Sequence, residues 1–136
     1  MRLTEEEYAT FQQQHAIRTA VGTAIAKART PPLPYANRLE ADYAALLELR
    51  KRAGELHDWR YQPLRLILAN RCTYEPDFLV IATDQTLELH ETKGGWFRDD
   101  ARVKVKVVAR LFPWFKLVIV TRKSIKAGWQ YEEIMG

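Results

Sequence analysis

The chain has 136 residues, of which 47% are hydrophobic and 28% are charged, which is the size and composition of one compact globular domain. Its formal charge of +4 favours polyanionic partners, and its single cysteine, Cys72, excludes a disulfide framework and a Cys-rich zinc site. Cysteine usage favours a cytoplasmic location, and the sequence predicts neither a secretory signal nor a membrane-spanning run of about 18 apolar residues.

The N-terminal stretch predicts a helical arm. Thr4 and Glu7 have the spacing of a capping box, and an Ala-rich segment continues to Arg29. Its apolar residues do not keep to one side of a helix, which indicates an accessory element, and the string PPLP then forms a stiff linker. We therefore expect an arm and linker over residues 1–36 and a separate domain over residues 37–136.

A second helix is expected from Asn37, a suitable N-cap, to a stop at Gly54. Apolar residues recur at i, i+4, i+7 and i+8 from Leu39, which predicts one buried side. Glu40 lies at the edge of that side, so its carboxylate should point along the protein body.

Strand-like runs joined by turn-forming residues follow, at Tyr61–Ala69, Thr73–Ala82 and Thr86–Lys93. Their short links favour an antiparallel meander. A fourth run, Lys116–Arg122, is almost entirely apolar and is expected inside the sheet. The tail, Ser124–Gly136, fits either an edge strand or a packed terminal segment.

Between the third and fourth runs, a helix capped by Asp99 or Asp100 should extend to about Phe112, because Pro113 ends it. The elements predict an α/β fold in the order α-β-β-β-α-β, with a mixed four-stranded sheet, helices against it and the N-terminal helical arm in addition.

Strand parity places two charges at the end of a buried surface. Leu87, Leu89, Glu91 and Lys93 share one side of their strand, and the last two lie roughly 7 Å apart. Charges beside apolar residues are costly unless they have partners or a metal. Asp77, at the start of an apolar strand, can supply a second carboxylate.

Two carboxylates and a cation suit phosphodiester hydrolysis. Asp77 and Glu91 could hold Mg²⁺ or Mn²⁺, which prefer oxygen ligands, and Lys93 could orient water or offset charge on phosphorus. Glu40 could support a second metal ion, so one-metal and two-metal chemistry both remain open. No histidine has a neighbour at metal-ligand spacing, and His90 points away from the acids.

These residues carry a resemblance. Pro76-Asp77, thirteen further residues and Glu91-Thr92-Lys93, in the expected element order, resemble the PD-(D/E)xK nuclease superfamily over about residues 37–122. Five segments look more closely like a group of small phage-encoded endodeoxyribonucleases, whose fold resembles that of phage Holliday-junction resolving enzymes: NRLEADYA, YQPLRLIL, YEPDFLV, LHETKG and DDARVKVKVVARLFPWF.

The resemblance implies a restriction-endonuclease-like core that hydrolyses branched or distorted DNA in phage replication or recombination, in the cytoplasm of the host. It implies that Asp77 and Glu91 ligate Mg²⁺ or Mn²⁺, that the Thr92 carbonyl completes the coordination, that Lys93 is catalytic and that Glu40 is the helix-borne acid. A symmetric homodimer would suit a four-way junction. A non-catalytic DNA-binding recombination accessory protein is the alternative, and RNA remains open as a substrate.

Structural interpretations of the same residues also stay open. Asp77 would then cap a strand, Glu91 and Lys93 would form a same-side ion pair, and Glu40 would be an ordinary helix-edge glutamate. Gln62 and Tyr74 are expected near the centre by strand order, in structural or supporting roles.

Six residues are candidate DNA contacts. The last helix carries a cationic stripe of Arg102, Lys106 and Arg110, which could follow a phosphate backbone or be a solvated surface. Lys104 is expected on the apolar side between Val108 and Leu111, where it would reach the site or extend its ammonium into solvent. Trp96 and Arg98, after two glycines, would stack on bases or pack under their loop.

Overall fold

The computed structural model describes residues 4–10, 12–13, 34–94 and 99–136. The chain divides into two compact units, Met1–Ala45 and Leu46–Gly136, and helix α2 (Arg38–Arg52) begins in the first and ends in the second. The expected domain boundary after residue 36 stays a prediction. Among the described residues, no helix has the length and apolar character needed to cross a bilayer.

The described part of the first unit contains the predicted capping box. The Thr4 amide donates to Glu7 Oε2 at 2.8 Å, and the Glu7 amide donates to Thr4 Oγ1 at 3.2 Å. Residues 5–10 and 12–13 are helical, as these reciprocal bonds favour. The rest of the predicted helix, to Arg29, lies outside the described residues.

Helix α2 begins and ends at the residues that the sequence indicated. The Glu40 amide donates to Asn37 Oδ1 at 2.9 Å, which confirms Asn37 as the N-cap. At the other end, Gly54 has a φ of 78°, and the amides of Gly54 and Glu55 donate to the carbonyls of Lys51 and Arg50. These two bonds are the Schellman arrangement, and they confirm the predicted stop.

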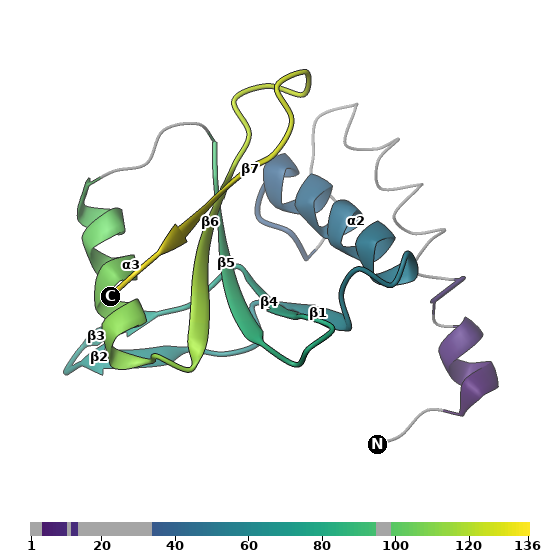
Figure 1. Cartoon of the computed structure of the whole chain (residues 1–136), viewed down its shortest axis with the longest axis horizontal. Helices are drawn as coiled ribbons and strands as arrows, with labels where there is room; N and C mark the ends of the chain where they lie inside the picture. Colours follow the sequence, from purple (N-terminus) through teal and green to yellow (C-terminus); the bar gives the residue numbers. More distant parts are fainter. Residues whose placement is uncertain (1–3, 11, 14–33, 95–98) are drawn as a thin grey trace. The chain divides into compact units, whose positions relative to one another are not determined.

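The second unit is built on a mixed sheet of five strands in the order β1-β4-β5-β6-β7 (Figure 1). Its strands are β1 (Asp58–Tyr61), β4 (Phe78–Ile81), β5 (Leu87–Lys93), β6 (Phe115–Thr121) and β7 (Gln130–Ile134). Strands β5 and β6 are parallel because α3 (Asp99–Leu111) connects them, and the other neighbours are antiparallel. The mixed α/β class is confirmed, whereas the number of four strands was wrong. The tail forms an edge strand.

The two runs predicted as continuous strands are interrupted at prolines, and β1 overlaps the first run only at Tyr61 because the sequence did not predict a strand over 58–60. Gln62 has a φ of 43° and precedes Pro63, so β1 ends at Tyr61 and the chain resumes as β2 (Leu66–Ala69). Pro76 has no amide hydrogen to give a ladder, and it separates β3 (Cys72–Tyr74) from β4. Strands β2 and β3 pair with each other as a separate two-stranded sheet.

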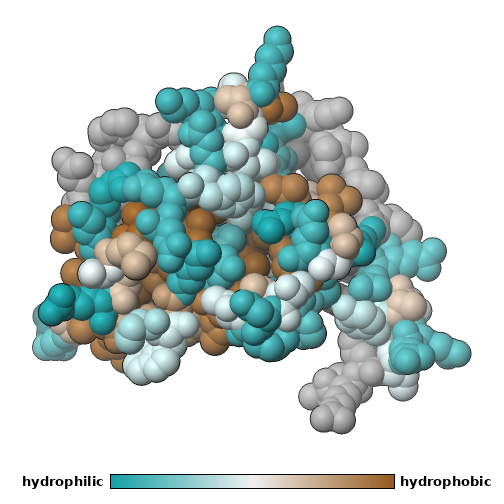
Figure 2. Space-filling view, viewed as in Figure 1, coloured by the Kyte–Doolittle hydropathy of each residue, from teal (hydrophilic) through white to brown (hydrophobic). Residues whose placement is uncertain are grey.

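Helix α3 packs on β2, β6 and β7 and covers a core that includes Leu89, Val105 and Val108 (Figure 1). The apolar side predicted from Val108 and Leu111 is buried at Val108 but was wrong at Leu111, which is 46% exposed. Lys104 is exposed, which fits the alternative that its ammonium extends into solvent. The buried side instead follows Val105, Val108 and Phe112. Figure 2 shows hydrophobic residues at the surface over α3 and the two-stranded sheet, among hydrophilic ones.

Candidate active site

Asp77 lies immediately before β4, and its side chain is hydrogen-bonded to β5. Its Oδ2 accepts two hydrogen bonds from Thr92, one from the backbone amide and one from Oγ1, both 2.9 Å long. Both residues are buried, with Asp77 9% exposed. Two donors on one carboxylate oxygen fix the side chain more firmly than a single donor would, and they satisfy that oxygen in a place with little water.

Glu91 lies beside Asp77. Phe78 pairs with His90 across the antiparallel strands β4 and β5, so extending this register by one residue sets Asp77 opposite Glu91. The Glu91 side chain is 12% exposed, and its Oε1 lies 3.4 Å from Lys93 Nζ. The site therefore combines the buried carboxylate of Asp77, the carboxylate of Glu91, which is exposed by 12%, and one ammonium group that is 32% exposed.

Tyr74 supplies a further contact to Glu91. Its hydroxyl donates to Glu91 Oε2 at 2.8 Å, and the tyrosine is buried at the end of β3. Burial raises the pKa of Tyr74 well above its ordinary value of 10.0, and the nearby Glu91 carboxylate raises it further, so the hydroxyl keeps its proton. The expectation that Tyr74 lies near the centre is confirmed.

Burial dominates the electrostatics of Glu91. It raises the pKa of the Glu91 carboxyl above the ordinary 4.5, although Tyr74, Lys93 and the backbone amide of Asp77 all favour the ionised form. Burial makes the charged form of this carboxylate unfavourable in the metal-free protein. A cation placed beside the carboxylate would stabilise that charged form and offset the cost of desolvation.

The structure thus brings together Asp77, Glu91, Thr92 and Lys93, the four residues of the sequence pattern. For Thr92, it is the amide and the hydroxyl that contact Asp77, and the role implied for its carbonyl stays a prediction. Gln62 contributes through its backbone, because its amide donates to the Asp77 carbonyl at 2.8 Å.

Glu40 has a local role in the first unit. Its carboxylate is buried, with the residue 6% exposed, and Oε2 accepts a 2.9 Å hydrogen bond from the Ala36 amide. An acid that binds a backbone amide before the helix is typical of helix N-termini, where the dipole also favours negative charge. Participation of Glu40 in a metal site stays a prediction.

The candidate DNA contacts fall into three groups. Trp96 and Arg98 lie outside the described residues. Arg102 is paired with Glu132, with Nη1 2.6 Å from Oε1 and Nη2 3.2 Å from Oε2. Lys104, Lys106 and Arg110 are exposed on α3.

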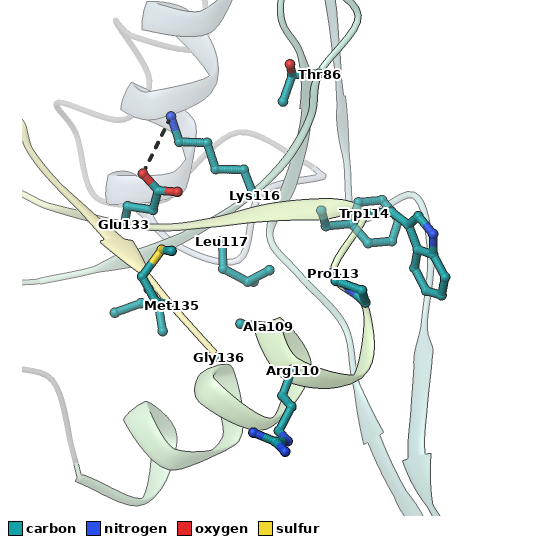
Figure 3. Close-up of a pocket in the computed structure, with 12 residues that line it drawn as sticks. Thr86, Ala109, Arg110, Pro113, Trp114, Lys116, Leu117, Glu133, Met135 and Gly136 are labelled. Atoms are coloured by element: carbon teal, nitrogen blue, oxygen red, sulfur yellow. Dashed lines mark ion pairs between the residues drawn. The ribbon is translucent and has the colours of Figure 1, made fainter.

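Two surface pockets of the second unit are lined by residues other than Asp77, Glu91, Thr92 and Lys93. One, of about 500 Å³, has Thr86 in its lining together with Lys116 and Glu133, which form a 3.9 Å ion pair (Figure 3). The other, of about 590 Å³, contains Glu88 and His90, whose Oε1 and Nε2 are 2.9 Å apart. Burial lowers the pKa of His90, so it is neutral at pH 7. As predicted, His90 points away from the two carboxylates of the candidate site, Asp77 and Glu91.

The donor set suits a hard divalent cation. Mg²⁺ is usually held through one or two carboxylates and completes its shell with water and substrate phosphate oxygens. Asp77 and Glu91 provide this pair, and in the described part of the chain no group of three or more His, Cys, Asp or Glu side chains is arranged to hold a metal. Carboxylate oxygens of this kind are the ligands that Mg²⁺ and Mn²⁺ prefer.

Comparisons of the chain with protein-family models, with curated proteins and with solved structures give no match.

Removing the Thr92 hydroxyl should loosen Asp77. We expect Thr92→Val to lower the free energy of unfolding by about 1–3 kcal/mol, because a buried carboxylate oxygen loses one of two donors while the side-chain volume is kept. Urea denaturation measures this, with Thr73→Val, at an exposed position of β3, as the matched control. Equal stability of Thr92→Val and wild type would contradict this account of Asp77.

Proposed function

We propose that the protein is a Mg²⁺- or Mn²⁺-dependent endodeoxyribonuclease of the PD-(D/E)xK type. The observation that carries the proposal is the pair formed by the buried Asp77 and the largely buried Glu91, held by donors from Thr92 and Tyr74 and accompanied by Lys93. Two neighbouring carboxylates with little exposure to water and one nearby ammonium are costly for a structural role and are suited to binding a divalent cation.

Each residue then has a defined task. Asp77 and Glu91 hold the metal through carboxylate oxygens, and the fixed hydrogen bonds to Asp77 Oδ2 and Glu91 Oε2 set the orientation of both groups. The bound cation makes water more acidic and offsets negative charge on the phosphate. Lys93 orients the attacking water, or stabilises charge that develops as the new P–O bond forms and the P–O ester bond breaks.

The substrate is DNA by resemblance, and the surface of α3 is compatible with that choice. Lys104, Lys106 and Arg110 are exposed, and no acid accompanies them between Ala101 and Leu111. Phosphate contacts of this kind give salt-dependent, sequence-independent affinity. Branched or distorted DNA as the preferred substrate, contacts from Trp96 and Arg98, and action as a homodimer belong to the same proposal.

The test is cleavage of a panel of linear, flapped, four-way and supercoiled DNAs with Mg²⁺, with Mn²⁺ and with chelator. We expect metal-dependent cutting that is lost in Asp77→Asn, while Asp84→Asn, at an exposed turn, retains it. Cutting that persists when Asp77, Glu91 and Lys93 are each replaced would overturn the proposal.

Two other outcomes separate the competing functions. Salt-sensitive DNA binding without cleavage under any divalent metal would favour the recombination accessory protein. Faster cleavage of RNA than of matched DNA duplexes would change the substrate while leaving the site chemistry intact, because the carboxylates contact the phosphate and do not read the sugar.

A further inference from the structure

One polar group of the candidate active site, the Tyr74 hydroxyl, comes from the two-stranded sheet. Strands β2 and β3 pair with neither edge of the five-stranded sheet, and β3 ends at Tyr74. The buried tyrosine packs in the same core as Val105, Val108 and Leu89, and its hydroxyl reaches Glu91 Oε2 at 2.8 Å.

The ring and the hydroxyl of Tyr74 have separable roles. The ring fills core volume, which a phenylalanine would fill equally well. The hydroxyl adds a polar atom that must find a partner when it is buried, and its acceptor is the Glu91 carboxylate. What distinguishes tyrosine from phenylalanine here is therefore its bond to a proposed metal ligand.

The three donors to Glu91 differ in rigidity. The Asp77 amide belongs to the backbone, and Tyr74 is fixed by its packing. Lys93 is 32% exposed and has a long, flexible side chain. Tyr74 is thus the side chain best able to fix the rotation of the carboxylate.

We propose that Tyr74 is a positioning residue, whose hydroxyl holds Glu91 Oε2 so that Oε1 is presented to the metal beside Lys93. This inference rests on the proposed function. It assigns the two-stranded sheet a role in metal binding, because outer hydrogen bonds to a ligating carboxylate determine its orientation and its affinity for the metal.

The test compares Tyr74→Phe with wild type by calorimetric titration of Mn²⁺ in the absence of DNA. We expect Mn²⁺ affinity to fall about 10- to 100-fold. Tyr61→Phe is the matched control: it makes the same chemical change in a ring that packs on Phe78, with the centroids 5.4 Å apart, and should leave Mn²⁺ affinity unchanged. Circular dichroism and thermal unfolding should show that both variants are folded, and the affinity for DNA in chelator should be the same in all three proteins.

The outcomes separate this inference from the proposed function. Unchanged Mn²⁺ affinity in Tyr74→Phe, with normal binding and cleavage by wild type, would overturn the positioning role alone. Loss of the folded state in Tyr74→Phe would assign the hydroxyl to stability and would overturn it as well. A wild-type protein that neither binds Mn²⁺ nor cuts any nucleic acid would overturn both.

Discussion

Replacing Glu91 with glutamine should abolish cleavage and, at the same time, stabilise the metal-free protein at neutral pH. We expect the rate to fall by about 10³-fold or more, because an amide is a poor ligand for Mg²⁺ and metal-assisted charge stabilisation amounts to several kcal/mol. The melting temperature should rise because glutamine keeps an acceptor for the Tyr74 hydroxyl and removes a charge that desolvation disfavours. Lys93, being 32% exposed, can be hydrated when the charge on Glu91 is removed.

The gain in stability should depend on pH in a defined direction. Burial raises the pKa of the Glu91 carboxyl above 4.5 in the folded state, so the folded protein binds this proton more tightly than the unfolded chain. The contribution to stability is fully present below pH 4.5 and is lost as the pH rises through the raised folded pKa. The difference in melting temperature between Glu91→Gln and wild type should therefore be small below pH 4.5 and grow towards neutral pH.

Thermal unfolding in chelator over this pH range measures the effect, and Glu133→Gln, at an exposed site on β7, is the control. A melting temperature of Glu91→Gln below that of wild type at pH 7 would indicate that the ion pair with Lys93 outweighs desolvation. That result would remove the electrostatic argument for a cation site.

Replacing Lys93 with methionine should separate catalysis from metal binding. The change keeps most of the side-chain length and removes the charge that lies 3.4 Å from Glu91 Oε1. We expect single-turnover cleavage to fall about 10²- to 10³-fold, the usual cost of losing one group that stabilises the transition state. Mn²⁺ affinity should be kept or increased, because the lysine competes with the cation for the same carboxylate.

The control is Lys116→Met, on β6, where the ammonium pairs with Glu133 at 3.9 Å. It should cut DNA as wild type does. If Lys93→Met lost Mn²⁺ binding together with cleavage, the lysine would act by keeping Glu91 ionised, and its direct catalytic role would be wrong.

The sequence predicted the surroundings of the site better than it predicted the sheet. Alternation along β5 set Glu91 and Lys93 on one side, because this is a local consequence of the two-residue period of a strand. Asp77 was expected only from its place at the start of an apolar strand, and the antiparallel pairing of β4 with β5 sets it opposite Glu91. The mixed class and the caps at Asn37 and Gly54 also followed from local chemistry. The specific restriction-endonuclease-like core stays a prediction.

The errors arose where short-range pattern and backbone chemistry conflicted. Apolar runs around Pro63 and Pro76 were interpreted as single strands, although a residue without an amide hydrogen cannot continue a ladder. Leu111 was wrongly predicted on the buried side of α3. Val103 and Val107 are apolar and exposed as well, so hydropathy alone could not identify the side that packs. The hydrogen bond between Tyr74 and Glu91 joins residues of two separate sheets, and no periodicity in the sequence encodes that contact.

The site depends on the number of residues between β3 and β4, the two strands that Pro76 separates. Residues 75–77 join the two sheets, and within four consecutive positions the chain supplies Tyr74, which bonds to Glu91, and Asp77, which bonds to Thr92. The number of residues in this link is therefore as much a part of the site as their identity. An added residue would rotate one side chain away from its partner, whereas the turn at Asn70 and Arg71, between β2 and β3, carries no such requirement.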